Sequence, residues 1–214
     1  MLRTPNISRY FIAQGGHAVE YSAGTSRLFW FSETRKTAEL LLNGLDKTKI
    51  KELAIKENIY QIRAEDRIRR IASVTLNRLE SLPETLVQQI INGDVGTAKL
   101  LVLISIMKTD RLFFEFVHEV HRQAILLGEN IITDRAVNDF FDSKIAQNEV
   151  VAKWTESAIK KLKQTYFKIL HEAGVLSSVK GERKIITPFV DYKTRQVLME
   201  NHLVVYLNAL TGDA

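Results

Sequence analysis

The sequence predicts a mainly α-helical protein, and three observations support this fold class. Apolar residues recur at spacings of three and four over most of the chain, which is the period of one face of an α-helix. Only three prolines occur in 214 residues, so long helical stretches are rarely interrupted. Small polar residues precede several of these stretches and glycine follows several, as expected of helix caps.

The first thirty residues are the exception to the helical pattern, because Gly15, Gly16 and Gly24 interrupt them. The apolar run 28–31 (LFWF) is expected to pack against the body of the protein. The chain after it predicts helices over residues 33–42, 47–57, 64–82, 84–91, 95–108, 111–127, 134–147, 156–173, 192–201 and 203–210. The predicted N-caps are Ser32, Asp46, Asp110, Thr133 and Thr155, and Gly174 is the predicted C-terminal glycine of the 156–173 helix.

Residues 155–186 carry the most information about function. The helix that Thr155 caps ends at Gly174, and residues 175–186 follow with β character and a basic tip. A helix followed by a basic β-hairpin is the local layout of a winged-helix nucleic-acid reader. We therefore predict a helical N-terminal domain over residues 1–130 and a winged-helix-like C-terminal domain with a short β-hairpin over residues 131–214.

Positive charge is concentrated in the same region. Residues 150–195 contain ten lysines and arginines against four acids, a local sum of +6. The whole chain carries +5, so the remainder sums to −1. Concentrated positive charge attracts a polyanion, which favours nucleic acid as the partner.

The 156–173 helix separates its apolar and polar residues. At about 100° per residue, one stripe is apolar and the opposite face is polar and basic, with no acid at its centre. Phe167 departs from this pattern and is expected to pack under the hairpin. The stripe contains Ala158, Ile159, Leu162, Tyr166, Ile169, Leu170 and Ala173.

Short polar residues near the start of such a helix can meet base edges in the major groove, and cations can meet phosphates. The alternative interpretation is a solvated lysine-rich face, which is common in soluble proteins. The predicted DNA-binding residues are Thr155, Ser157, Lys160, Lys161, Gln164 and Lys168 on the helix and Lys180, Arg183 and Lys184 on the hairpin.

A second basic segment spans residues 47–78, with nine cations against four acids. Arg63, Arg67 and Arg70 are spaced i, i+4, i+7, so they are predicted to line one helix face and to add phosphate contacts. The alternative is an exposed face that neighbouring acids partly neutralise. Residues 110–150 instead carry eight acids and four cations, which favours a protein partner there.

Catalytic and metal-binding motifs are missing from the sequence. There is no cysteine, and no P-loop, nucleophile elbow or Ser/His/Asp motif appears. Glu115 and His118 have the Glu-x-x-His spacing of helical metal sites, but a di-metal bundle needs that motif twice. We therefore expect His118 and His121 along a helix surface, no metal or cofactor, and structural roles for Asp110 as a cap and Arg111 as the partner of an acid.

The remaining sequence features predict a non-enzymatic cytoplasmic protein. The N-terminus lacks the apolar region of a signal peptide. The apolar run 100–107 is far shorter than the roughly 20 residues that a membrane span needs. Neither a membrane nor a small-molecule substrate is expected as a partner.

Several stretches in this order resemble the BrxA family of bacteriophage-exclusion (BREX) defence islands. They are 21–24 (YSAG), 33–42 (ETRKTAELLL), 108–113 (KTDRLF), 152–157 (AKWTES) and 170–176 (LHEAGVL). The resemblance covers roughly residues 20–210. It implies a small helical defence component without catalytic residues, a NusB-like N-terminal part and DNA binding. The sequence departs from the expected glycine-containing turn at 26–31, which affects only the local conformation there.

The leading hypothesis is double-stranded DNA binding, mainly through phosphates, in phage defence, with other BREX proteins as further partners. One alternative is a protein-interaction scaffold that uses the acidic region 110–150 or the apolar run 28–31. Another alternative is RNA binding, which a NusB-like shape would allow.

Overall fold

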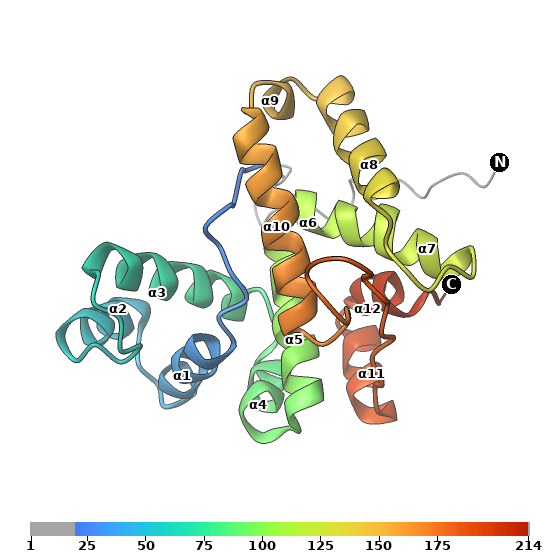
Figure 1. Ribbon diagram of the computed structural model, residues 1–214. Coiled ribbons are helices and arrows are strands. Elements are labelled where there is room, and N and C mark those ends of the chain that lie inside the picture. The colour runs from blue at the N-terminus through green and yellow to red at the C-terminus, as the bar shows by residue number, and fades with distance from the viewer. Residues whose placement is uncertain (1–19, 214) are drawn as a thin grey trace.

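The central element of the fold is the apolar helix α5 (Val95–Thr109), in a computed structural model that describes residues 20–213 (Figure 1). Every residue of α5 from Leu100 to Met107 is buried. The helix contacts α1, α3, α4, α6 and α12. A helix that is apolar on all sides must be surrounded by other elements, which explains this position. Gly15 and Gly16 lie outside the described residues.

The structure confirms the mainly α-helical prediction. Among the described residues, no helix is long and apolar enough to cross a bilayer. The other helices are α1 (Phe31–Leu42), α2 (Lys47–Lys56), α3 (Glu65–Glu80), α4 (Glu84–Asn92), α6 (Arg111–Phe116), the π-helix η2 (Val117–His121), α7 (Arg122–Leu126), α8 (Asp134–Gln147), α9 (Glu149–Ala152), α10 (Glu156–Glu172), α11 (Tyr192–Glu200) and α12 (Val204–Thr211).

The predicted β-hairpin is reduced to isolated pairings. Its two arms run antiparallel, with one isolated bridge between them in the described chain, from Leu176 to Ile185. Ser177 N–H also donates to the carbonyl of Lys184 over 2.9 Å, and Ile186 N–H donates to the carbonyl of Val175 over 3.0 Å. The second arm also forms a bridge from Lys184 to Ile131, which precedes α8. The 175–186 segment is therefore a loop with isolated β-bridges, one within the loop and one to Ile131, and not a regular pair of strands.

Most of the predicted caps are confirmed. The side chains of Asp46, Asp110, Thr133 and Thr155 each accept a hydrogen bond from a backbone N–H of the helix that follows. The Ser32 prediction is wrong, because α1 already begins at Phe31.

The predicted helix 111–127 is interrupted by one π-helical turn. His118 and His121 lie in this turn, and both are buried, with exposed fractions of 7% and 0%. Their predicted place on a helix surface is therefore wrong. Burial lowers the pKa of His121 to about 4, so this side chain is neutral at pH 7. No described group of three or more His, Asp or Glu side chains has a metal-binding arrangement.

The described apolar core forms two clusters that Arg78 bridges. Phe29 belongs to the main cluster, and Trp30 belongs to a second cluster with side chains of α2 and α3. Arg78 is only 2% exposed; its Nη1 donates to the carbonyl of Phe29 over 3.1 Å and its guanidinium lies 5.6 Å from the Trp30 ring centre. Burial lowers the pKa of Arg78 to about 9, so the guanidinium still carries its charge at pH 7. The predicted packing of the run 28–31 is confirmed for these two aromatic residues.

The main cluster includes residues on both sides of the predicted domain boundary near residue 130. Phe113, from before the boundary, packs edge-on against Tyr166, from after it, with 5.0 Å between ring centres. The division into 1–130 and 131–214 stays a prediction.

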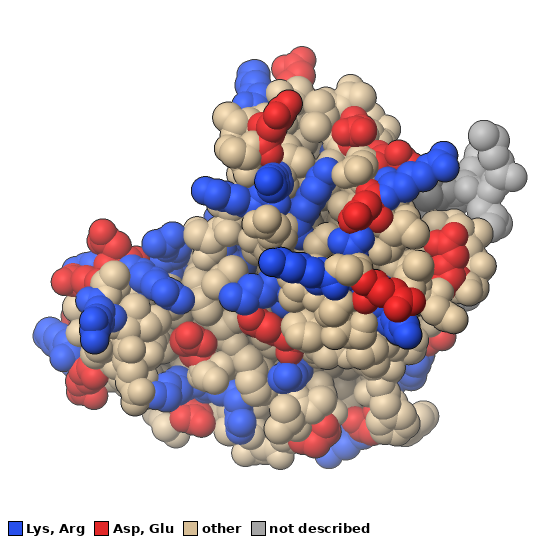
Figure 2. All heavy atoms as spheres, in the orientation of Figure 1, with Lys and Arg blue, Asp and Glu red and all other residues tan. Residues whose placement is uncertain are grey.

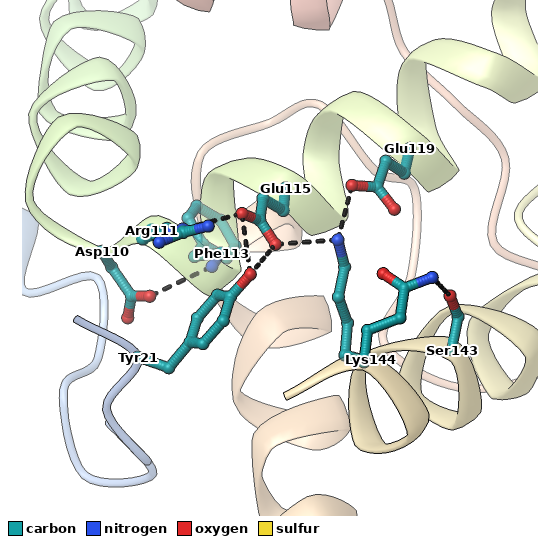
Figure 3. A network of polar contacts seen from close by, with 9 residues as sticks. Tyr21, Asp110, Arg111, Phe113, Glu115, Glu119, Ser143 and Lys144 are labelled. Carbon is teal, nitrogen blue, oxygen red and sulfur yellow. Dashed lines mark hydrogen bonds and ion pairs between the residues drawn. The ribbon is translucent and has the colours of Figure 1, made fainter. Parts of the chain in front are cut away.

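A buried ionic network holds α8 against α6 and η2 (Figure 3). Glu115 is 2% exposed and accepts from Arg111 Nε at 2.9 Å, from Lys144 Nζ at 2.8 Å and from the Tyr21 hydroxyl at 2.8 Å. Lys144 also contacts Glu119 Oε1 at 2.7 Å. Burial and the Glu115 carboxylate raise the pKa of Tyr21, so its hydroxyl stays protonated and donates. The predicted pairing of Arg111 with an acid is confirmed.

Lys144→Ala is expected to lower the free energy of unfolding by about 3 kcal/mol, because it leaves Glu115 buried with one cation fewer. The matched control is Arg135→Ala on the same helix, since Arg135 is 91% exposed and its loss should cost under about 0.5 kcal/mol. Urea unfolding of both variants measures the difference. Equal destabilisation by the two variants would contradict the role of the network.

Candidate nucleic-acid interface

Helix α10 presents its polar face outward because its apolar stripe is buried. Ile159, Leu162, Tyr166, Ile169 and Leu170 are all buried, as the stripe predicts. Tyr166 contacts three aromatic rings, those of Phe113, Phe116 and Phe141. The opposite face is exposed at Ser157, Lys160, Lys161, Gln164, Lys168 and His171. In Figure 1, α10 is the long helix that crosses the front of the molecule.

Both ends of α10 are fixed by local hydrogen bonds. The Thr155 hydroxyl accepts from the backbone N–H of Ala158 over 3.2 Å and lies 3.0 Å from the hydroxyl of Ser157. At the other end, Gly174 has a φ of 84°, and the N–H of Val175 donates to the carbonyl of Leu170. This is a Schellman motif, for which glycine is suited because it adopts positive φ without a steric penalty.

The loop after α10 folds back over the helix and is anchored by Arg183. This side chain is 8% exposed, and its guanidinium lies 4.3 Å from the centre of the Phe167 ring. Arg183 also donates to the carbonyl of Ile132 over 3.2 Å and to Asp134 Oδ1 over 2.5 Å. Phe167 therefore packs under the loop, as predicted, while Arg183 fastens the loop to the start of α8.

A cavity of about 670 Å³ lies between α8, α10 and this loop. Lys160, Gln164 and Lys168 line it from α10, and Lys180 and Arg183 line it from the loop. Five of the residues predicted to bind DNA therefore share one concave surface.

A second cavity, of about 460 Å³, lies on the other side of Lys168. Its lining includes three cations, Arg67 of α3, Lys99 of α5 and Lys168, together with two acids, Glu33 and Glu172. Lys168 therefore belongs to the lining of both cavities. Figure 2 shows this face, with lysine and arginine side chains over α10, over the loop and over the α2–α3 region.

Several of these cations are available for a ligand. Lys160, Lys161 and Lys180 are exposed and form no ion pair with another residue in the part of the chain described. Lys168 and Lys184 have only loose acidic neighbours, Glu172 and Glu182, each at 3.7 Å. Loose exposed pairs contribute little and exchange readily for a phosphate.

The structure does not bring all the predicted residues together. Thr155 and Ser157 lie at the far end of α10 and line neither cavity. Arg63 precedes the N-cap Ala64, so only Arg67 and Arg70 share the α3 surface and the predicted i, i+4, i+7 stripe is wrong at its first member. Lys184 is exposed on the second arm of the loop and lines neither cavity.

Other residues of the surface went unpredicted. Lys163 and His171 of α10 line the larger cavity, as do Val137 and Asn138 of α8 and Val179 of the loop. The place of Lys163 on this surface could have been predicted from the sequence, because it lies one helical turn from Lys160 and from Phe167. The contributions of α8 and Lys99 could not have been predicted from the sequence, since they depend on how distant segments pack.

Comparison with known proteins gives the family. The sequence model of the BrxA family matches residues 19–202. A BREX protein BrxA from Bacillus cereus (strain H3081.97) is 42% identical over 188 residues, which cover 88% of this chain and 94% of that protein. The chain belongs to the BrxA family.

A more distant BrxA relative agrees with this assignment, and one solved structure shares the fold. A BREX protein BrxA from Escherichia coli O9:H4 (strain HS) is 25% identical over 146 residues, or 68% of each chain. A crystal structure of an uncharacterised protein from Magnetospirillum magneticum has a TM-score of 0.77 at 22% identity, and the match covers 90% of this chain and 99% of that one. At that identity the likeness shows only that the two chains share a fold.

Arg183→Ala is expected to lower the free energy of unfolding by about 2 kcal/mol, because it strands a buried carbonyl and uncovers Phe167. Arg183→Lys should recover less than half of this loss, since an ammonium cannot stack and fork as a guanidinium does. Lys184→Ala is the control, with an expected change under about 0.5 kcal/mol. Denaturant unfolding measures all three, and full recovery by lysine would contradict the anchoring geometry.

Proposed function

We propose that this chain is a non-enzymatic DNA-binding component of a cytoplasmic BREX phage-defence system. It contacts duplex DNA mainly through phosphates. The observation that carries the proposal is the joined concave surface, on which unpaired cations of α10 and the following loop face the same side. Half to two-thirds of the hydrogen bonds in protein–DNA complexes go to phosphates and sugars, so such a surface suits a duplex.

In this proposal α10 and the 175–186 loop act as a winged-helix-like unit. The loop is held to the helix by Arg183 and Phe167 at 4.3 Å, so the Lys180 tip keeps a fixed place relative to Lys160. Arg67 extends the phosphate track from the NusB-like N-terminal part, across the hollow that it shares with Lys168. Cations on both sides of one helix can meet the two strands that flank a groove.

Binding to random-sequence duplex DNA is expected to weaken by about three to five decades between 50 and 200 mM salt, if about six to ten phosphates are contacted. Counterions released from the DNA cause this dependence. Fluorescence anisotropy at several salt concentrations measures it. A nearly flat dependence would contradict a phosphate-dominated interface.

Lys160→Glu combined with Lys161→Glu is expected to weaken duplex binding at least about tenfold and to reduce the salt slope by about two. Both side chains are exposed, so the melting temperature should change little. The matched control is Arg135→Glu with Lys193→Glu, two exposed cations on α8 and α11 that line neither cavity, with the same change in charge. If gel shifts of both double variants match the native protein, α10 has no part in binding.

A protein-interaction scaffold within the defence complex is the second candidate. One predicted surface for it is lost, because Phe29 and Trp30 of the run 28–31 are buried. A different surface favours it: Phe189 is 89% exposed and Tyr192 is 80% exposed, which is unusual for large aromatic side chains. Co-purification with other BREX proteins after nuclease treatment would support the scaffold.

RNA binding is a separate alternative. Competition between duplex DNA and structured RNA at equal salt would separate DNA binding from RNA binding.

A further inference from the structure

The larger cavity beside α10 has the size of a small-ligand site. Its volume of about 670 Å³ lies within the range of roughly 300–1,000 Å³ that is typical of pockets for small molecules. Flat phosphate-binding surfaces do not need such a hollow. The cavity therefore offers more than a track for a DNA backbone.

The floor of this cavity is apolar and aromatic. Val137 of α8, Phe167 of α10 and Val179 of the loop line it. The guanidinium of Arg183 lies over the Phe167 ring at 4.3 Å, which adds a planar cation to the lining. Planar guanidinium groups and apolar side chains are the surfaces on which nucleobases stack.

The walls of the cavity present unused positive charge. Two of its lining cations have acidic partners, because Arg183 pairs with Asp134 and Lys168 lies near Glu172.

Three lining lysines have no acid within 4.0 Å among residues 20–213. Lys160 and Lys163 project from α10, and Lys180 comes from the opposite wall. Lys163 donates to the Asn138 amide oxygen over 2.7 Å, a neutral partner that a phosphate can replace. Three ammonium groups around one space suit a single phosphate group.

The cavity also has polar groups that can recognise the edge of a base. The amides of Gln164 and Asn138 offer both donors and acceptors. His171 Nδ1 lies 3.0 Å from the carbonyl of Leu176 and donates to it, which leaves Nε2 for a ligand. A bare phosphate can use only the donors among these groups, whereas the edge of a base can use both donors and acceptors.

We propose that this cavity binds one nucleoside phosphate unit. Lys160, Lys163 and Lys180 hold the phosphate, and the base stacks on the Arg183 guanidinium, which covers the Phe167 ring, and packs against Val179. The inference rests in part on the proposed DNA binding, because the cavity shares Lys160, Gln164, Lys168 and Lys180 with that surface. The unit can come from a free mononucleotide or from an unpaired nucleotide of a DNA strand.

The test is isothermal titration of the full chain with 2′-deoxyadenosine 5′-monophosphate, 2′-deoxyadenosine and inorganic phosphate. The nucleotide is expected to bind at least about tenfold more tightly than either fragment, since only the nucleotide uses both floor and walls. Equal affinity for the nucleotide and inorganic phosphate overturns the proposal.

Val179→Trp fills the floor without changing any charge, and it should weaken nucleotide binding at least about tenfold. Val150→Trp is the matched control, because Val150 is 47% exposed on α9 and lies outside the cavity lining. Lys180→Ala is a second variant, on an exposed loop position, and should weaken nucleotide binding at least about fivefold. Unchanged nucleotide affinity in a folded Val179→Trp protein, or in Lys180→Ala, overturns the proposal.

Two further measurements separate this inference from the proposed duplex binding. Val179→Trp should still bind perfect duplex DNA within about twofold of the native protein, since it keeps every cation. If duplex binding holds but the nucleotide fails, only the cavity proposal is lost; the reverse result removes only duplex binding.

Binding to a duplex with one extrahelical base, compared with binding to a perfect duplex, identifies the source of the nucleotide. Binding at least about fivefold tighter than to the perfect duplex, with the gain lost in Val179→Trp, identifies a strand nucleotide. Equal binding of the two duplexes, with tight mononucleotide binding, identifies a free nucleotide.

Discussion

The burial of one stripe of α10 is the constraint on which the candidate surface depends. Leu162 and Leu170 are fully buried and Tyr166 is 1% exposed, against an aromatic cluster that includes Phe113 and Phe116. Burying each such side chain contributes roughly 1.5–3 kcal/mol. A turn of the helix by one residue would expose these groups and bury lysines, which costs far more than any gain. The direction of the lysines is thus a consequence of core packing.

The two walls that flank α10 are held by interactions of a different kind. The loop wall depends on Arg183, which ties it to Phe167 and to the start of α8. The α8 wall depends on Lys144, which is 7% exposed and reaches Glu115 on α6. Displacing either partner of such a pair would leave a buried charge unpaired, which is costly and favours one arrangement of the walls. The hollow beside α10 is therefore a defined shape.

Local chemistry explains what could be predicted from the sequence. The α10 stripe, its Thr155 cap and its C-terminal Gly174 all follow from residues within one helix, and all are confirmed. The burial of His121 could not be predicted, because it depends on the π-helical turn and on segments far along the chain. Similarly, the predicted hairpin is reduced to isolated bridges, and the bridge from Lys184 to Ile131 could not be predicted because Ile131 lies far away in the sequence. For the candidate site, the contributions of α10 and the loop were readable, whereas those of α8 and Lys99 were not.

The distribution of charge along the chain affects how a polyanion approaches the surface. Residues 150–195 sum to +6 while the rest of the chain sums to −1, so the net positive charge of the protein is carried by this segment. A polyanion approaching such a protein is steered to the basic side before any specific contact forms. This electrostatic steering does not depend on the base sequence of the nucleic acid, and neither do contacts to phosphates. Selectivity for a particular nucleic-acid structure must then come from groups that do not read phosphates, and on this face those are the apolar and amide side chains between α8 and α10.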